Sequence, residues 1–286
     1  MAGEGFGFYR IHILQSLPDG DMNTGLHLFR SLQDQKDTEG HVEFARIASA
    51  TELLGVLSSI LHTLQETGQI PLIHLEVHGR AEGFDLSSRE FLEWTQLKEI
   101  LTEINIGCMS NLFIAVSACQ GESLVRMVRA TEPAPFWGCL GPREENVHAG
   151  MLLDTFKTFY TNLLKTGNVR QALGACGGGL PFDGEPFVLW PAHYFFMVAY
   201  RSYLATMCTE EKIAERADFI ISELMGSAGE QVSLPPDLRP RVLADLNDHE
   251  TFFKAARRSF FMLDRFPENE ARFDVEFSKI KGASGT

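Results

Sequence analysis

Two short, mainly apolar runs, 71–77 and 111–116, each lead to a reactive side chain near a glycine. His78-Gly79 follows the first run, and Cys119 follows the second, with Gly121 two residues later. Runs of this length and composition are typical of strands buried in a parallel sheet. Parallel strands present their carboxyl ends at one edge of the sheet, so the histidine and the cysteine are expected to meet there. Such a pair allows an imidazole to activate a thiol for attack on a carbonyl carbon.

The first two thirds of the chain predict strands that alternate with helices. Further strands are expected at 8–17, 42–48, 136–140 and from 187, and helices at 51–64, 91–104, 122–129, 151–164 and 169–175. The apolar residues of 91–104 fall on one helical stripe, and Ser49 or Thr51 is a candidate N-cap ahead of the helix that stops near Gly68. This alternation predicts an α/β fold of three layers, with a mostly parallel central sheet covered by helices on both faces.

The pattern changes near residue 192. The run 194–207 is apolar and aromatic, helices are expected within 210–225 and 237–266, and the proline-containing segment 227–240 predicts a loop between them. We therefore expect two parts, an α/β domain at 1–205 and a helical C-terminal extension at 206–286.

Composition narrows the setting of the protein. A chain of 286 residues with 44% hydrophobic residues is able to bury a full core, and its net charge of -13 argues against nucleic-acid binding as its main role. Five cysteines, an odd number without a CxxC pair, predict reduced thiols rather than a disulfide framework. No signal peptide and no apolar run of membrane-spanning length is recognised. The expected location is the cytoplasm, without membrane contact.

The segments around the pair resemble bacterial caspase-like cysteine peptidases of the CHAT type, within the wider caspase and metacaspase group. The caspase signature Q-A-C-[RQG]-G, with its histidine about 50 residues upstream, differs here mainly at Ser117. The resemblance extends over about 8–190 and is carried by Pro71-x-x-His74-x-Glu76-x-His78-Gly79, Trp94-x-x-Leu97, Ile104-Asn105, Asn111-Leu112, Ser117-Ala118-Cys119-x-Gly121, Gly141-Pro142 and Phe156-x-x-Phe159-Tyr160 followed by Leu163-Leu164.

This resemblance implies a caspase-like fold and a cysteine endopeptidase that cleaves a protein substrate without a metal or other cofactor. Cys119 would be the nucleophile, His78 would protonate the leaving amine, and the backbone amides of Gly79 and Cys119 would bind the oxyanion. The side chains expected to support the site are His74, Glu76, Ser117 and Gln120. Family context further implies a protease of bacterial antiphage defence or cell death.

Specificity and control are less defined by the sequence. Arginine-cleaving relatives carry an acidic residue where Ser117 stands, and caspases bind a P1 aspartate through arginines, for which Arg80, Arg89 and Arg143 are candidates. Few residues separate Cys119 from the strand expected at 136–140, so activation by cleavage there is not expected. We expect control by a regulatory protein partner instead.

Other interpretations remain open. One is a non-catalytic interaction module on the same fold, and another is a metal-dependent hydrolase that uses His74, Glu76 and His78 on one strand face. The segment 19–25 predicts an ordinary polar turn, although its spacing is similar to that of a calcium loop. Gly177–Gly179 predicts a flexible loop that borders the substrate groove, and the rival bases His148 and His193 are expected to be structural.

Overall fold

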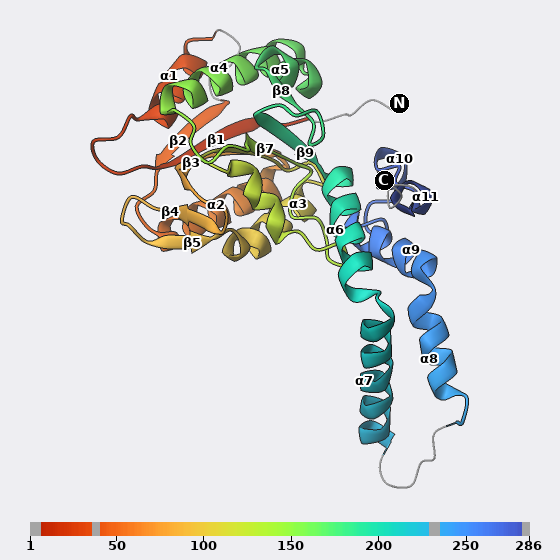
Figure 1. Cartoon of the computed structure of the whole chain (residues 1–286). Coiled ribbons are helices and arrows are strands. Elements are labelled where there is room, and N and C mark those ends of the chain that lie inside the picture. The colour runs from red at the N-terminus through yellow and green to blue at the C-terminus, as the bar shows by residue number, and fades with distance from the viewer. Residues whose placement is uncertain (1–6, 36–40, 229–234, 282–286) are drawn as a thin grey trace.

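The computed structural model describes residues 7–35, 41–228 and 235–281. Its centre is a mixed, mostly parallel sheet between layers of helices (Figure 1). The strands on the main path of this sheet are β1 (Arg10–Ser16), β2 (Val42–Arg46), β3 (Pro71–Gly79), β6 (Phe113–Ser117), β7 (Gly138–Pro142), β8 (Gly178–Gly179) and β9 (Phe187–Pro191). They lie in the order β2-β1-β3-β6-β7-β9-β8, and β9 runs antiparallel to β7 while the neighbouring pairs from β2 to β7 are parallel. The expected α/β class with a mostly parallel sheet is confirmed.

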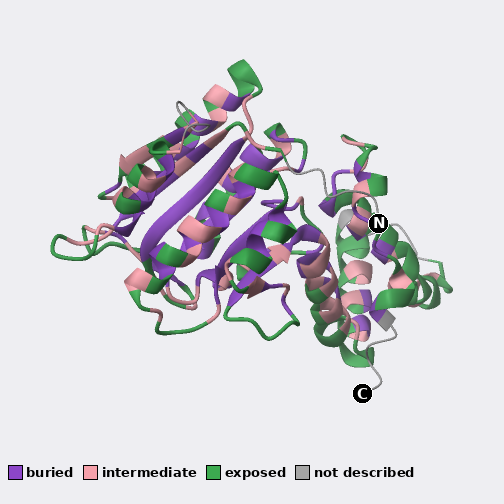
Figure 2. Cartoon of the chain, turned by 90° about the horizontal axis from the view of Figure 1, so that it is seen from above, coloured by how far each residue is buried: buried purple, intermediate pink, exposed green. Residues whose placement is uncertain are grey.

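Helices cover both faces of the sheet. One layer holds α1 (Thr24–Gln33), α4 (Ala149–Thr166) and α5 (Val169–Ala175), and the other holds α2 (Ala50–Thr67) and α3 (Lys98–Gly107) (Figure 1). The strands are buried between helices whose outer faces are exposed (Figure 2). Local signals set the helix ends: the Ser49 side chain accepts from the Glu52 amide to cap α2, and Gly68 ends it with a positive φ of 69°.

The register places the carboxyl end of β3 beside that of β6. The last pair between these strands is Glu76 with Ser117. Alternation along β3 directs His74 and Glu76 towards the layer of α1 and α4, where the His74 ring contacts Phe156 and Tyr160. The loops that follow β1, β3, β6 and β7 therefore share one edge of the sheet.

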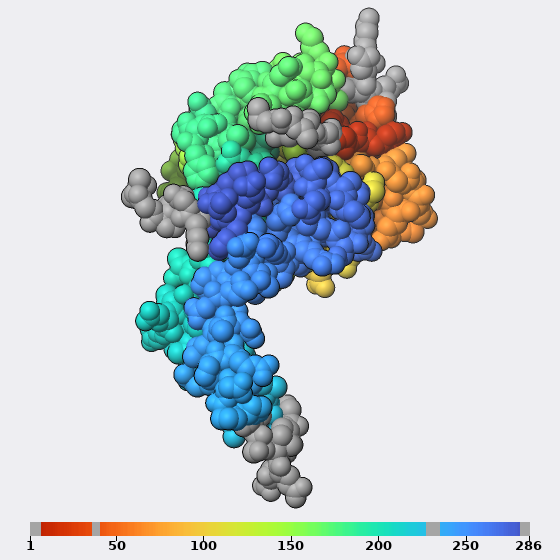
Figure 3. Space-filling view, turned by 90° about the vertical axis from the view of Figure 1, so that its right-hand side faces the viewer, coloured from red at the N-terminus to blue at the C-terminus, as the bar shows by residue number. Residues whose placement is uncertain are grey.

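The C-terminal part is helical, as the sequence predicts for 210–225 and 237–266. It comprises α6 (Ala192–Met207), α7 (Glu210–Ala228), α8 (Leu238–Asn247), α9 (His249–Phe260), α10 (Asn269–Arg272) and α11 (Phe277–Lys281). Helices α7 and α8 project from the body as an arm, whereas α9 to α11 pack against it (Figures 1 and 3). Phe196, Phe253 and Phe260 belong to the main core, and the Ala134 amide donates to the Phe260 carbonyl at 3.0 Å. None of the described helices is long and apolar enough to cross a membrane.

Two predicted helices near the site need correction, one in its first residues and one in its bounds. The segment 91–104 begins as a strand, β5 (Phe91–Glu93), paired with β4 (Gly83–Asp85) in a hairpin next to β3, and continues as the 3-10 helix η1 (Trp94–Leu97) before α3. A reciprocal capping box between Glu93 and Gln96 starts the helical region at Trp94 instead of Phe91. The helix predicted at 122–129 is present as a 3-10 helix, η2 (Gly121–Met127).

The predicted ends in the extension also need correction. Pro240 lies in the first turn of α8 rather than in the loop, because proline is tolerated where no helical amide bond is needed. The helix predicted over 237–266 is broken at Asp248, whose side chain accepts from the Thr251 amide at 3.0 Å and caps α9. Residues 229–234 of the predicted loop lie outside the described residues.

Candidate active site

His78 and Cys119 lie at the same edge of the sheet, each two residues beyond the Glu76–Ser117 pair. Neighbouring strands run only about 4.8 Å apart, so the two segments are adjacent. The Gly79 backbone is pressed against the cysteine turn, since a Cβ atom on Gly79 would lie 2.4 Å from the Cys119 carbonyl oxygen and 2.8 Å from Ala118 Cβ. The backbone segments that carry His78 and Cys119 are therefore in contact at this edge.

Asp21, in the loop between β1 and α1, holds the imidazole of His78. Its Oδ2 atom lies 2.6 Å from His78 Nε2, and the two side chains are 42% and 55% exposed. With Nε2–H donating to the carboxylate, Nδ1 is the nitrogen left to accept a proton. The sequence predicts only a polar turn at 19–25 and misses this role. The available signal is topological, because the loop after β1 opens at the same edge as the loop after β3.

The backbone amide of Gly79 is directed away from the hairpin. Arg80 and Gly83 exchange both backbone hydrogen bonds, which makes Gly79 and Phe84 a non-hydrogen-bonded pair. The chain beyond β4 lies on the side of β1, where the Ser87 amide donates to Ser16 Oγ at 2.8 Å. The Gly79 amide therefore faces the side of β6, from which Cys119 follows.

Close backbone packing fixes the cysteine turn. Gln120 adopts a left-handed conformation with a φ of 52°, and its amide donates to the Glu144 carbonyl at 2.9 Å. A Cβ atom on Gly121 would lie 2.6 Å from the Val116 carbonyl oxygen, and one on Gly141 would lie 2.7 Å from the Gly121 carbonyl carbon. This turn leaves the Cys119 side chain half-buried, and the described residues supply no backbone acceptor for the Cys119 amide.

Gly79→Ala should lower turnover strongly while leaving a folded protein. The new methyl group has to displace the Cys119 carbonyl, and a displacement of about 1 Å at a catalytic turn can cost about 10²-fold in rate. The matched control is Gly55→Ala in α2, where nothing lies within 4 Å of the added Cβ. Peptide-cleavage rates for both variants, with their melting temperatures, measure the effect; full activity of Gly79→Ala would contradict this geometry.

Three of the other four cysteines are in environments unsuited to a nucleophile. Burial raises the pKa of the Cys108 thiol to about 12 and that of Cys176 to about 11. Burial and the Glu122 carboxylate raise the pKa of Cys139 as well. These three thiols stay protonated at neutral pH, and the fourth, Cys208, lies at the end of α6 in the extension.

Two of the arginines considered for a P1 aspartate already bind carboxylates. Arg80 forms an ion pair with Asp85, and Arg143 Nε donates to Glu122 Oε1 at 3.3 Å. Because both guanidinium groups already pair with carboxylates, neither arginine is singled out as a receptor for a P1 aspartate.

The Ser117 side chain is buried, and its hydroxyl has no hydrogen-bond partner among the described residues.

His74 and Glu76 make buried hydrogen bonds, as expected, and these bonds are separate from the bond between His78 and Asp21. His74 Nε2 contacts Glu76 Oε1 at 3.0 Å, while His78 contacts Asp21 instead. Across the described residues, no group of three His, Cys, Asp or Glu side chains converges as a metal ion requires. His148 caps α4 by accepting from the Gly150 amide at 3.1 Å, a structural role that the sequence predicts.

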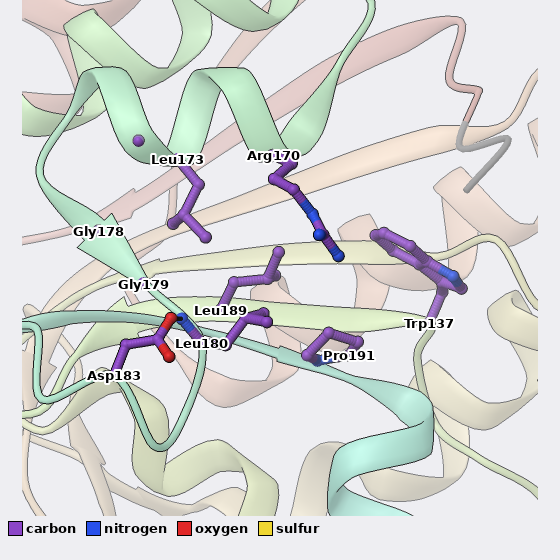
Figure 4. A pocket seen from close by; sticks show the side chains of 10 residues that line it. Trp137, Arg170, Leu173, Gly178, Gly179, Leu180, Asp183, Leu189 and Pro191 are labelled. Atoms are coloured by element: carbon purple, nitrogen blue, oxygen red, sulfur yellow. Dashed lines mark hydrogen bonds between the residues drawn. The ribbon is translucent and has the colours of Figure 1, made fainter. Parts of the chain in front are cut away.

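A cavity of about 230 Å³ lies between α5 and the sheet (Figure 4). Its lining includes Trp137, Arg170, Gly179, Asp183 and Pro191, and none of its residues belongs to the loops that carry His78 or Cys119. The prediction of a flexible loop at Gly177–Gly179 is wrong for Gly178–Gly179, which pair with β9 as strand β8 and line this cavity.

No family model matches this sequence, and a comparison with curated proteins finds no significantly similar one. Function is therefore inferred from the geometry of the His78–Cys119 edge and from the motifs that surround it.

Proposed function

We propose that the protein is a caspase-like cysteine endopeptidase, with Cys119 as nucleophile and His78 as general acid–base. The observation that carries this proposal is the Asp21–His78 hydrogen bond at the end of β3, directly beside the turn that presents Cys119. A nucleophile, a base and a group that orients the base are the three parts of an activated thiol site. Here they come from three neighbouring strand ends.

The reaction proceeds in two halves. His78 Nδ1 takes the thiol proton, the Cys119 sulfur attacks the peptide carbonyl carbon, and the resulting oxyanion accepts bonds from the Gly79 and Cys119 amides. The imidazolium, held by Asp21, returns its proton to the leaving amine as the C–N bond breaks, which leaves a thioester. Water then attacks the thioester, His78 accepts its proton and returns it to the sulfur, and the carboxylate product leaves.

The test is cleavage of a peptide library and of candidate protein substrates, with new termini identified by mass spectrometry. The proposal predicts new termini with the wild type and none with a variant that lacks the Cys119 sulfur. Identical termini from both proteins would refute it. The proposed setting, a regulated bacterial defence or cell-death protease, rests on the motif resemblance and directs the choice of substrates to the products of neighbouring genes.

A second role, protein binding, is favoured by the arm formed by α7 and α8. Phe219 and Met225 on α7 are 64% and 60% exposed, although they are large apolar side chains. Exposed apolar surface of this kind marks interaction sites. We propose that a regulatory partner binds the arm and stimulates cleavage. The isolated chain is then expected to have low activity.

The double variant Phe219→Ser and Met225→Ser should fold normally and lose stimulation by a partner. Substitutions at exposed positions usually change the free energy of unfolding by less than about 0.5 kcal/mol. Truncation after residue 206 is a poorer test, because it also removes Phe253 and Phe260 from the core. Activity is compared with and without co-expressed products of neighbouring genes; full activity of the purified wild type alone would contradict control by a partner.

A further inference from the structure

A buried carboxylate lies two residues before His78 and has no part in the proposed chemistry. The Glu76 side chain is 2% exposed and accepts hydrogen bonds from His74 Nε2 at 3.0 Å and from Thr24 Oγ1 at 2.6 Å. Among the described residues, no lysine or arginine forms an ion pair with it. Burying a carboxylate costs folding free energy unless hydrogen bonds compensate for the lost water. The hydrogen bonds that Glu76 makes therefore need an explanation.

The hydrogen bonds on both sides of Glu76 point towards its carboxylate. Burial and the Glu76 carboxylate raise the pKa of the Tyr160 hydroxyl, which therefore keeps its proton. His74 Nε2–H donates to the Glu76 carboxylate, which leaves Nδ1 to accept from the Tyr160 hydroxyl 3.0 Å away. Thr24 donates from the other side. Glu76 is thus the common acceptor of a chain that ends at Thr24.

Thr24 is the first residue of α1 and follows the loop that carries Asp21. Its backbone amide donates to the Met22 carbonyl at 2.8 Å, and the Asp21 amide donates to the Pro18 carbonyl at 3.3 Å. The Thr24 hydroxyl and the Asp21 carboxylate, which holds His78, are therefore separated by a single backbone turn, the one closed by the Thr24–Met22 hydrogen bond. Fixing Thr24 fixes the end of the loop that bears Asp21.

The first turn of α1 lies unusually close to β1 and β3. A Cβ atom on Gly25 would lie 2.9 Å from Gln15 Oε1 and 3.0 Å from Glu76 Cγ. Asn23, the N-cap residue, makes no side-chain cap bond but accepts from Gln15 Nε2 at 3.0 Å. Contacts with the strands, rather than a local cap, therefore determine where α1 begins.

We propose that Glu76 is a positioning residue, which acts through Thr24 to place Asp21 against His78. This inference rests on the proposed function, because it assigns Glu76 a role in orienting the proposed base. Glu76 does not touch substrate. It sets the orientation and tautomer of the imidazole through the α1 loop, as the hydrogen-bond partners of metal-binding histidines fix the orientation and tautomer of those rings.

The test compares two substitutions, each of which removes a hydroxyl group at one end of this hydrogen-bond chain. Thr24→Val removes the hydroxyl next to the Asp21 loop, and kcat should fall by about 10- to 100-fold with KM unchanged, the range expected for a small displacement of a catalytic group. Thr24→Ser keeps the hydroxyl and should restore kcat. Tyr160→Phe removes a buried hydrogen bond at the far end and should lower stability while preserving kcat.

A second readout is independent of catalysis. Long-range ¹H–¹⁵N NMR of His78 at pH 8.5 should report the Nε2–H tautomer in the wild type, Thr24→Ser and Tyr160→Phe, and a mixture of tautomers in Thr24→Val. Thr24→Ala, which lacks the bulk of valine, serves if Thr24→Val does not fold. An unchanged tautomer and kcat in the Thr24 variants, or equal losses in Tyr160→Phe, would overturn the positioning role. Failure of the proposed function would be recognised separately, because cleavage would then not depend on Cys119.

Discussion

Replacing Cys119 by alanine should reduce peptide cleavage by at least about 10⁴-fold, because losing the nucleophile of a catalytic triad leaves only the contribution of binding and the oxyanion hole. The fold should persist, since the Cys119 side chain is half-buried at a strand end and the turn is held by backbone contacts of Gln120 and Gly121. Cleavage rate and melting temperature are measured under conditions in which the wild type cleaves.

Cys208→Ala is the matched control for this experiment. Cys208 is also half-buried, but it lies at the end of α6, away from the strand edge that holds His78. Its loss should leave the cleavage rate unchanged. Cleavage by Cys119→Ala at the wild-type rate would remove Cys119 from the mechanism.

Replacing His78 by alanine should lower kcat by about 10²- to 10⁴-fold, the usual contribution of general acid–base catalysis. KM should change little, because the imidazole acts on protons in the transition state rather than on substrate binding. The measurement is a full kcat and KM determination with a single peptide substrate.

His62→Ala controls for the loss of an exposed imidazole. His62 lies on α2 and is paired with Glu66, so its removal should leave kcat unchanged. An increase in KM with unchanged kcat for His78→Ala would assign His78 to substrate binding and not to proton transfer.

The sequence predicts the strands of the site because their signals are local. Apolar runs locate β3 and β6, and Gly68 and Gly167 mark the ends of α2 and α4, each with a positive φ. The carboxyl-edge rule then brings His78 and Cys119 to one side of the sheet without further information. The class of the fold and this edge therefore follow from local patterns and general topology.

Elements that depend on distant partners are not predicted. Phe91–Glu93 fits a helical stripe, yet it forms a strand because β4 folds back beside it. The antiparallel direction of β9 depends on its pairing with β7, and the 3-10 form of η2 depends on close packing of Gly121 against Val116 and Gly141. Asp21 contacts a residue far away in the chain, so no local pattern at 19–25 indicates its role.

The most direct test of the central claim is the rate at which iodoacetamide alkylates each cysteine, followed by mass spectrometry of tryptic peptides. This readout depends on activation of the thiol and does not require a substrate or a partner. In the wild type, Cys119 should react faster than Cys176 and Cys208, and His78→Ala should slow Cys119 alone, because the thiolate is the reactive form and the imidazole removes the thiol proton. Alkylation of Cys119 no faster than that of Cys208, and unaffected by the loss of His78, would contradict an activated Cys119–His78 pair.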